Sequence, residues 1–499
     1  MNTGSDRNTD GQVFRDLRAY LDFLDEAGEL LNIGGAHWNL EIGGLTQLAV
    51  HNRPSPSLLF DEIVDHDPGF RVLTNGVATP FQWSAAAGLP PVESKRDAVV
   101  LQKERSSLAS MTFHEPEVVK AGPILEHVQR DDEVDVTRFP APKWNDLDGG
   151  RYIGTGDVVV TRHADTGKLN AGTYRVCVHD DDVVLSHISP GKDGRINIES
   201  YLTAGEPAPI AISIGHPPDV FIAANEYTPT HLDELAYLGG LRGEPLQVIE
   251  GEVTGLPFPA HSEIVLEGHI YPDDELVPEG PFGEWTGYYS GGSHEESEHR
   301  VPPIRVERVY HRDDPIIFGV PPIRPPGEVR SEIRNAARLW NELDDAGIKG
   351  VTGVNSMPFG PGWFEVISIE QAYSGHAAQV GYHAASGPAG GYHGRFTVIV
   401  DDDVDVFDQD AVLWAMSSRC DPAGDIHILT DCWSTSLDPR IPPERKRAGD
   451  FTNTRAVIDA TRPYHWRDEF PDVNVLNDDT LSLIEERYPD LVGPDGPLS

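Results

Sequence analysis

The apolar residues near the N-terminus recur at the spacing that places them on one face of a helix. They are Phe14, Leu17, Leu21 and Leu24. This spacing predicts a helix within residues 13–33. The elements that follow are short and mixed up to about residue 115, so we expect residues 1–118 to form a small α/β domain.

Between about residues 120 and 310 the pattern changes to short apolar runs separated by Gly, Pro and Asp, which is typical of strands and turns. The predicted strands are Asp157–Arg162, Gly172–His179, Ile210–Ile214, Asp219–Ala223, Glu263–Tyr271 and Ile304–Tyr310. Residues 231–241 have helical spacing, with Thr230 as the expected N-cap and glycines at the end. We therefore expect residues 119–315 to form a β-barrel or sandwich with an inserted helix.

A stiff stretch rich in proline, Pro321–Gly327, precedes the last region. Beyond it, predicted helices alternate with predicted strands, an arrangement typical of an open α/β sheet. The helices are residues 328–346, 369–380 and 408–417, and the strands are residues 348–354, 363–368 and 395–401. We expect an α/β domain over residues 316–474 and one short helix in the tail, residues 475–499.

The chain carries far more negative than positive charge. Its 499 residues include 81 Asp and Glu but only 39 Lys and Arg, a net charge of −42. Such charge repels itself in dilute buffer, and molar salt shortens the range of the repulsion to about 3 Å. Because the acidic residues are spread along the whole chain, we interpret them as an adaptation to a salt-rich cytoplasm. The same charge argues against a nucleic-acid partner, which would require a basic surface.

Three absences narrow the class of protein further. The three cysteines, Cys177, Cys420 and Cys432, lack C-x-x-C spacing, so we expect neither a disulfide framework nor a zinc knuckle. No apolar run approaches the roughly 18–20 residues that span a bilayer, and the polar start of the chain lacks the apolar core of a signal peptide. We therefore expect a cytoplasmic globular protein without a membrane span.

The segment Pro278–Ser290 contains two carboxylates, Glu279 and Glu284, separated by a Gly-Pro-Phe-Gly turn. The glycines allow close approach of the backbone, and the proline fixes one φ angle. Phe282 and Trp285 supply apolar walls, which raise the pKa of a carboxyl group so that it can act as a general acid near neutral pH. A surface turn with two ordinary acidic residues is the alternative, but the dense Gly, Pro and aromatic framing favours a functional site.

In the predicted strand Gly172–His179, alternation places Thr173, Arg175 and Cys177 on one face and the valines on the other. If the valines face the core, Arg175 points into a cleft. There its guanidinium can bind a carboxylate or phosphate through two hydrogen bonds. A surface Arg on an edge strand is the alternative, and these residues alone leave the two interpretations about equal.

Three histidines in the last region, His376, His383 and His393, do not have the spacing of a common metal site. Each lies among Gly and Ala residues. We interpret them as exposed or capping residues and base no metal site on them.

These segments resemble the UbiD family of decarboxylases, which use prenylated FMN. Pro278–Tyr289 is similar to the family's signature nearly residue for residue, Asn170–Arg175 resembles its cofactor strand, and Glu234–Gly243 resembles its metal-ligand helix. Weaker similarity covers nearly the whole chain in matching order. The resemblance implies a multidomain α+β fold with an N-terminal α/β domain, a middle split β-barrel of flavin-reductase type and a C-terminal α/β domain used in oligomerisation.

The resemblance also implies roles for residues at matching positions. Arg175, Glu279 and Glu284 would form the catalytic group, with Glu284 as the proton donor. Asn170 and Glu234 would hold a divalent metal, Mn²⁺ or Mg²⁺, that bridges to the cofactor phosphate. The residues implied in cofactor binding are Asn170, Thr173, Tyr174, Arg175, Lys192 and Glu234.

The third metal ligand departs from the family pattern. Some relatives carry a His in the loop after the cofactor strand, where this chain has Asp193. An Asp oxygen suits Mn²⁺ or Mg²⁺ about as well as a His nitrogen does. We expect Asp193 to be the ligand, with His187 as the competing candidate, and K⁺ as a further possible ion.

The implied reaction is the non-oxidative, reversible decarboxylation of an unsaturated acid, for which an aromatic, benzoate-type acid is the favoured substrate. A separate flavin prenyltransferase would supply the cofactor, and a homodimer or homohexamer is the expected assembly. An FMN-dependent oxidoreductase is the alternative enzyme, although it would not need two Glu across the turn. A non-catalytic flavin-binding protein is the other alternative, which leaves the Arg and Glu residues unexplained.

Overall fold

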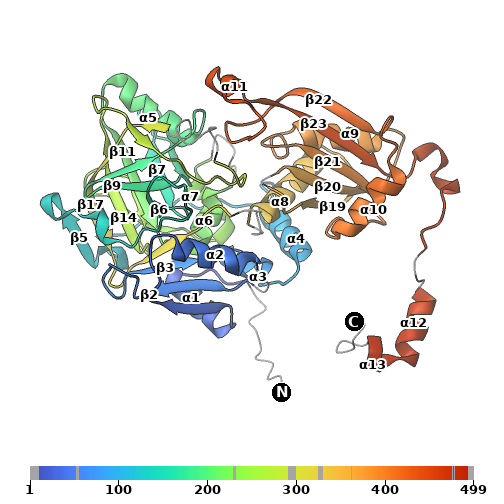
Figure 1. Cartoon of the computed structure of the whole chain (residues 1–499), viewed down its shortest axis with the longest axis horizontal. Coiled ribbons are helices and arrows are strands. Elements are labelled where there is room, and N and C mark those ends of the chain that lie inside the picture. Colours follow the sequence, from blue (N-terminus) through green and yellow to red (C-terminus); the bar gives the residue numbers. More distant parts are fainter. Residues whose placement is uncertain are drawn as a thin grey trace.

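The structure is a computed structural model that describes residues 11–51, 55–226, 228, 232–289, 299–323, 330–360, 362–474, 476 and 478–492. Figure 1 shows three regions: a blue N-terminal region, a green central sheet that curls on itself, and an orange C-terminal sheet covered by helices. This arrangement is the multidomain α+β fold expected from the sequence. None of the described helices is long and apolar enough to cross a membrane.

The N-terminal region is a four-stranded sheet in the order β1-β2-β3-β18. The strands are β1 Leu30–Gly34, β2 Ser57–Asp61, β3 Arg71–Thr74 and β18 Ile316–Gly319, and the helices are α1 Leu17–Glu26, α2 Glu41–His51, α3 Pro80–Ala86 and α4 Lys95–Arg105. Strand β18 pairs in parallel with β3. Residues 316–319, which the sequence analysis placed at the start of the third region, therefore complete the first sheet.

Helix α1 confirms the helix predicted from apolar spacing near the N-terminus. Leu17, Leu21 and Leu24 are all buried on one face. The helix begins after Asp16, whose side chain accepts a hydrogen bond from the backbone of Ala19 and so satisfies one of the free N–H groups of the first turn.

The central sheet has nine strands, all paired antiparallel, in the order β6-β9-β10-β17-β14-β11-β7-β8, and β5 pairs with β17. Its strands are β5 His127–Arg130, β6 Arg151–Gly154, β7 Val158–Arg162, β8 Leu169–Gly172, β9 Val176–Asp180, β10 Val183–Ser186, β11 Ala208–Ile214, β14 Ile264–Ile270 and β17 Ile304–His311. Four of the predicted strands correspond closely to β7, β11, β14 and β17. The apolar runs of β7, β11 and β14 are mostly buried, and β17 has apolar residues between charged ones, so the sequence identifies all four strands.

Smaller elements flank this sheet. They are the sheet of β4 Glu117–Val118, β12 Gln247–Glu250 and β13 Pro257–Pro259, the pair β15 Val277–Glu279 and β16 His299–Val301, and the helices α5 Asp193–Ala204, α6 Pro218–Ala224 and α7 Glu234–Arg242. The strand predicted at Asp219–Ala223 is wrong, because this segment is helix α6 with a proline in its first turn. Every residue of α6 except Ala224 is buried, so the sequence shows no amphipathic pattern.

Two further predictions in this region need correction. The helix predicted at 231–241 begins at Glu234, and Asp233 rather than Thr230 provides the N-cap; Thr230 itself lies outside the described residues. The strand predicted at Gly172–His179 is two strands, because β8 ends at Gly172 and β9 begins at Val176. Arg175 therefore lies in the irregular connection between two strands.

The C-terminal sheet has the order β19-β20-β21-β23-β22, with parallel pairs at its centre. Its strands are β19 Val351–Ser356, β20 Phe364–Ile369, β21 Phe396–Asp401, β22 Ile426–Trp433 and β23 Thr452–Ala460, and its helices are α8 Arg330–Asp345, α9 His376–Ser386, α10 Gln409–Arg419 and α11 Pro443–Arg447. The helix predicted at residues 369–380 begins at His376, seven residues after its predicted start. The sequence analysis did not predict β22 or β23. The described part of the tail contains two short helices, α12 Asp478–Arg487 and α13 Pro489–Val492, instead of one, and they lie apart from the three regions (Figure 1).

The interpretation of the three histidines is wrong for two of them. His376 and His393 are buried, and burial lowers the pKa of His393 to about 3, which keeps it neutral. His383 is partly exposed and lies 3.4 Å from Glu342. Among the described residues, no group of three or more His, Cys, Asp or Glu side chains is arranged to hold a metal.

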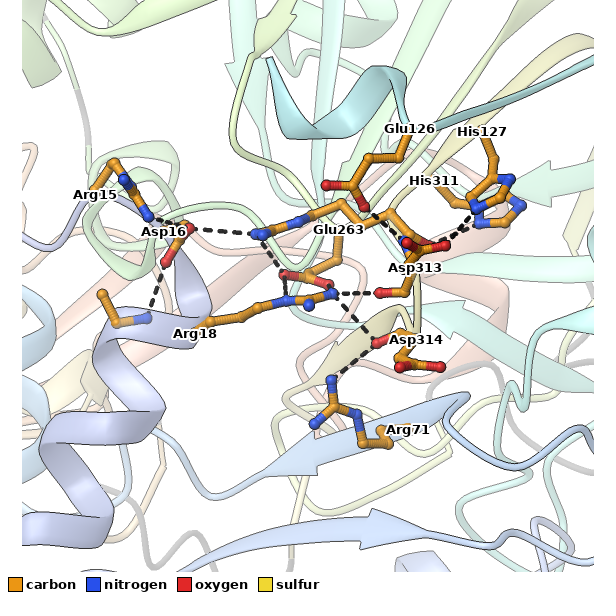
Figure 2. Close-up of polar contacts among 12 residues, drawn as sticks. Arg15, Asp16, Arg18, Arg71, Glu126, His127, Glu263, His311, Asp313 and Asp314 are labelled. Atoms are coloured by element: carbon orange, nitrogen blue, oxygen red, sulfur yellow. Dashed lines mark hydrogen bonds and ion pairs between the residues drawn. The ribbon is translucent and has the colours of Figure 1, made fainter.

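A buried group of charges fixes helix α1 to the central sheet (Figure 2). We call Asp16, Arg18, Glu263 and Arg312 the α1 cluster. Arg18 donates to both oxygens of Glu263 at 2.9 and 2.8 Å, and Arg312 donates to Glu263 at 3.1 Å and to Asp16 at 3.2 Å. Within this cluster two guanidinium groups, of which that of Arg18 is partly exposed, thus match two buried carboxylates.

Candidate active site

A cavity of about 1140 Å³ lies where residues of all three regions meet. The N-terminal region contributes Trp83, the central region contributes Phe221, Phe282 and Trp285, and the C-terminal region contributes Tyr392. Ligand pockets in proteins measure roughly 300–1,000 Å³. This cavity is therefore large enough to hold a cofactor together with a second small molecule.

Arg175, Glu279 and Glu284 meet at one wall of this cavity, and we call them the Arg175 cluster. Arg175 donates from Nε to Glu279 Oε1 at 2.8 Å and from Nη2 to Glu279 Oε2 at 2.7 Å. Its Nη1 donates to Glu284 Oε1. The sequence analysis expected these three residues to form one group, and the structure brings them together across more than a hundred positions of the chain.

The two carboxylates of this cluster differ in their access to the cavity. Glu284 lines the cavity, whereas Glu279 lies behind Arg175, with its side chain fully buried. Both oxygens of Glu279 accept hydrogen bonds from Arg175. Within the described part of the chain, Oε2 of Glu284 has no hydrogen-bond partner. Glu284 is therefore the member of the cluster that can exchange a proton with a molecule in the cavity.

Burial and neighbouring charges set the protonation of the cluster. Burial raises the pKa of Glu284; the positive charge of Arg175 opposes this shift, and the negative charge of Glu279 adds to it. Burial disfavours the charge of Arg175, but the charges of Glu284 and Glu279 outweigh burial and raise its pKa. One permanent cation thus faces two carboxyl groups, an arrangement that favours a proton on one of them.

The backbone that carries Glu284 is held by a residue from a distant loop. Asp148 accepts hydrogen bonds from the backbone of Gly283 at 3.0 Å and from the hydroxyl of Tyr289 at 3.2 Å. The backbone N–H of Gly149 donates to Pro281 at 2.7 Å, and a side chain at position 149 would collide with the chain at Gly280. The turn between the two glutamates is therefore fixed from outside its own segment.

The far side of the cluster is closed by an aromatic and a thiol group. The hydroxyl of Tyr152 donates to Glu279 Oε1 at 3.1 Å, and its ring lies 4.4 Å from that of Phe282. Burial raises the pKa of the Cys177 thiol to about 12, so this cysteine is no nucleophile. Phe282 also lies under the guanidinium of Arg175, 5.0 Å from the ring centre.

A second polar group in the same cavity is formed by Asn170 and Glu234. Asn170 Nδ2 donates to Glu234 at 3.3 Å, and its Oδ1 accepts from Tyr174 at 3.3 Å. Glu234 also accepts from the backbone of Ala171 and from Thr228, and burial raises its pKa. Within the described residues no Lys or Arg forms an ion pair with this buried carboxylate. Its oxygen donors and its unbalanced charge fit a hard divalent cation.

The expected third ligand lies on the same wall but is more exposed. Asp193 begins helix α5, lines the cavity, and has its carboxylate 3.7 Å from the ammonium group of Lys168. The following residue, Gly194, lies close to Asn170 Oδ1, 3.1 Å from the position of an added Cβ. The competing candidate, His187, also lines the cavity.

The remaining residues that the sequence analysis assigned to the cofactor also line the cavity. Thr173 Oγ1 accepts a hydrogen bond from Asn225 at 3.0 Å, Tyr174 lies beside Asn170, and the ammonium group of Lys192 lies 4.8 Å from the ring centre of Tyr392. The structure therefore places the predicted cofactor residues and the Arg175 cluster around one cavity.

Three family models match the chain in order. They describe the 3-octaprenyl-4-hydroxybenzoate carboxy-lyase N-terminal domain over residues 21–99, the Rift-related domain over residues 117–325 and the C-terminal domain over residues 332–460. Together they cover most of the sequence. The chain belongs to the UbiD family of carboxy-lyases. This membership confirms both the resemblance and the enzyme class inferred from the sequence.

Relatives of this UbiD chain include decarboxylases for different acids. A phenolic acid decarboxylase of Sedimentibacter hydroxybenzoicus is 30% identical over 91% of this chain and 92% of the relative. A pyrrole-2-carboxylic acid decarboxylase of Pseudomonas aeruginosa is 29% identical over 90% of this chain and 91% of the relative. The similarity therefore extends over nearly the full length of both proteins.

Solved structures of UbiD enzymes share the fold. The closed form of the vanillic acid decarboxylase of S. hydroxybenzoicus has a TM-score of 0.81 and 28% identity, covering 97% of this chain and all of that one. The UbiD-class enzyme HmfF of Pelotomaculum thermopropionicum, in complex with FMN, has a TM-score of 0.79 and 26% identity, covering 94% and 99%. A bound flavin is thus observed in a similar structure.

Sequence reasoning missed several residues that shape this site. Asp148, Tyr152 and Lys446 each act on the Arg175 cluster or its cavity from distant segments. No local motif surrounds them. The rarity of lysine, with eight in the whole chain, is no signal for Lys446 in particular, because it applies equally to the other seven.

Proposed function

We propose that this UbiD enzyme removes the carboxyl group of an unsaturated, aromatic, benzoate-type acid without net oxidation, using prenylated FMN. The observation that carries the proposal is Glu284, a buried carboxyl with a raised pKa that lines the cavity and is bonded to Arg175. A group of this kind can hold a proton near neutral pH and deliver it to a reacting carbon. The reverse reaction would use the same group as a base.

The residues present fit the cofactor and a divalent metal. Asn170, Glu234 and Asp193 would hold Mn²⁺ or Mg²⁺, with His187 as the alternative to Asp193, and Thr173, Tyr174 and Lys192 would contact the cofactor. K⁺ is a further candidate ion for the same acidic wall. Prenylated FMN, when bound, supplies a sink for the electrons of the breaking bond. A separate flavin prenyltransferase is the proposed source of the cofactor.

Each member of the Arg175 cluster has a distinct part. Glu279 holds Arg175 in place and keeps it charged through two hydrogen bonds. Arg175 has five N–H groups, of which three are engaged by the two glutamates, so two remain to orient the substrate carboxylate. Glu284 holds a proton and transfers it to the carbon from which CO₂ has left.

The cavity walls favour a flat, apolar substrate. Phe282, Trp285, Phe221 and Ile323 line the cavity beside the polar groups. Aromatic side chains of this kind pack against a planar ring and exclude water from the reacting centre. The phenolic and pyrrole acids named for two relatives support a ring-bearing substrate.

Measurement of CO₂ release tests the proposal. The protein, loaded with prenylated FMN and Mn²⁺ in molar KCl, is offered benzoate-type, acrylic and heteroaromatic acids. Release of CO₂ from a benzoate-type acid is expected. Flavin reduction without CO₂ release would instead support the alternative of an FMN-dependent oxidoreductase, and retention of flavin without turnover would support a flavin carrier.

We also propose that the enzyme assembles as a homodimer or homohexamer through its C-terminal region. Large apolar side chains are exposed on helix α10 and on the edge strand β22: Leu413, Trp414 and Ile428. Such side chains favour association of copies, and an edge strand offers unpaired backbone groups. Light scattering of the wild type and of Trp414→Glu, with a smaller mass expected for the variant, tests this assembly.

A further inference from the structure

One wall of the cavity comes from a single segment of the C-terminal region, residues 434–451. This segment connects β22 to β23 and contains the short helix α11. Figure 1 shows α11 above the junction between the central sheet and the C-terminal sheet. The cavity is lined by Leu437, Lys446 and Phe451 from this segment and by Glu284 from the central region. The segment therefore faces the Arg175 cluster from another part of the fold.

Fixed contacts define the shape of this wall. The buried carboxylate of Asp438 accepts two hydrogen bonds from Arg395, each of 2.7 Å, and a third from Asn453 at 3.4 Å. At the other end of the segment, Arg445 donates to Asp450 at 2.7 Å. These bonds fix the backbone on both sides of Lys446, so its side chain is presented from a stable base.

Lys446 is a cation without a partner of its own. Within the described residues its side chain forms no hydrogen bond and no ion pair, while its backbone N–H donates to Pro442 at 3.2 Å. Burial lowers the pKa of its ammonium group, and the negative charges of Asp438 and Glu284 oppose that shift. Asp438 is already engaged by Arg395, and Glu284 by Arg175. Lys446 is partly buried, and an ammonium group that loses part of its water without gaining an acceptor costs free energy, which a ligand oxygen would offset.

We propose that Lys446 binds an oxygen on the ring of the substrate, a phenolate or a second carboxylate, and so selects aromatic acids that carry one. The inference rests on the proposed function only for the class of substrate. The apolar walls at Phe282 and Trp285 suit the ring itself, and Arg175 suits the carboxyl group that leaves. A lysine ammonium is a compact point charge that pairs well with a single oxygen, whereas a paired arginine fork suits a carboxylate.

Binding measurements test this selection without requiring turnover. The full-length protein, with its cofactor content matched between samples, is titrated by calorimetry with benzoate, 4-hydroxybenzoate and terephthalate. The variant is Lys446→Met, which keeps length and removes charge. The control is Lys349→Met, which makes the same change at an exposed lysine outside the cavity. Both variants alter the net charge of the chain equally.

We expect wild type and Lys349→Met to bind 4-hydroxybenzoate or terephthalate at least about tenfold more tightly than benzoate, as a hydrogen bond to a charged group provides. Lys446→Met should lose this preference and bind benzoate as before. Preference for 4-hydroxybenzoate alone would identify the phenol oxygen as the partner, and preference for terephthalate alone would identify a second carboxylate.

Two results would overturn the inference. Equal weakening of all three acids in Lys446→Met would show general attraction of anions, and loss of flavin from this variant alone would place Lys446 at the cofactor. Failure of the proposed function is detected by a different measurement, the release of CO₂. A protein that releases no CO₂ from any acid can still show whether its binding selectivity depends on Lys446.

Discussion

The Arg175 cluster and the α1 cluster use the same chemistry for different ends. Each buries glutamate against arginine through short hydrogen bonds. The α1 cluster contains two guanidinium groups for two carboxylates, whereas the Arg175 cluster contains one guanidinium for two. The first is balanced in charge, and the second has one carboxyl group in excess.

A raised pKa does not separate the two clusters. Burial raises the pKa of Glu263 as it raises that of Glu284, although Arg18 opposes the shift at Glu263. The difference lies in access, because Glu263 has both oxygens bonded to arginine and is fully buried, while Glu284 lines the cavity with one oxygen unbonded within the described residues. A proton donor therefore needs an accessible oxygen as well as a raised pKa. The α1 cluster has no such oxygen and stabilises the packing of helix α1 against the central sheet.

Loss of the accessible carboxyl should have the largest effect. Glu284→Gln keeps the shape and the contact with Arg175 but cannot donate an acidic proton, so turnover should fall by about 10²–10⁴-fold. Cofactor binding and melting temperature should stay near those of the wild type. CO₂ release and flavin absorbance of the purified variant check this. A variant that keeps more than about a tenth of wild-type turnover would remove Glu284 from the role.

The same substitution in the α1 cluster should lower the free energy of unfolding and leave turnover unchanged. Glu263→Gln leaves Arg18 and Arg312 with one carboxylate, and breaking a buried ion pair costs about 3–5 kcal/mol of the free energy of unfolding. Turnover per folded molecule should not change. Chemical denaturation beside an activity assay measures both quantities. A Glu263→Gln enzyme with normal stability and reduced turnover would reverse the contrast between the clusters.

Substitutions of Asn170 and Glu234 should affect the binding of metal and cofactor. Asn170→Ala and Glu234→Ala should each weaken Mn²⁺ binding by at least about tenfold, and cofactor retention should fall with it, because the phosphate charge loses its counter-ion. Metal analysis and flavin absorbance give the result. Normal metal content in both variants would refute the assignment of this wall, and Glu263→Gln serves as the control that leaves metal unchanged.

Glu365 is a third buried carboxyl group, hydrogen-bonded to a serine instead of an arginine, and its effect on stability should depend on pH. Glu365, bonded to Ser356 at 2.5 Å, has its pKa raised from 4.5 to about 7 by burial. The folded state therefore binds more protons than the unfolded state between these values, so this group's contribution to stability falls as pH rises from 4.5 through 7. Glu365→Gln should remove up to roughly 3 kcal/mol of that pH dependence. Denaturation curves between pH 4.5 and 8 check this, and equal slopes in both proteins would contradict it.

Salt should affect the Arg175 cluster least. With −42 charges spread over the chain, we expect the melting temperature to rise steeply from tens of millimolar to molar KCl, because screening removes surface repulsion. The buried bonds of Arg175 are poorly screened, so turnover per folded molecule should change little. A melting series in KCl beside one in a non-ionic stabiliser of matched osmolarity distinguishes the causes. Equal protection by both would end the interpretation of the acidic residues as salt adaptation.

Sequence periodicity predicted elements that expose one face or form long apolar runs, such as α1 and β14. It failed at α6, because helix and strand patterns are indistinguishable when a segment is buried all round. The segment with Glu279 and Glu284 was found because its residues are contiguous. Tyr152 was not, since it reaches Glu279 across 127 positions that local patterns do not connect. The pairing of Arg175 with both glutamates followed from resemblance, not from spacing.

The wall formed by residues 434–451 also has a consequence for how such enzymes diversify. Its anchors, the bonds of Asp438 to Arg395 and of Arg445 to Asp450, lie within its own region, and none of them involves the Arg175 cluster. Residues between the anchors can therefore be replaced while the proton-transfer machinery is inherited intact. Substitutions in this short segment can therefore change which acid the enzyme accepts, while Arg175, Glu279 and Glu284 stay the same.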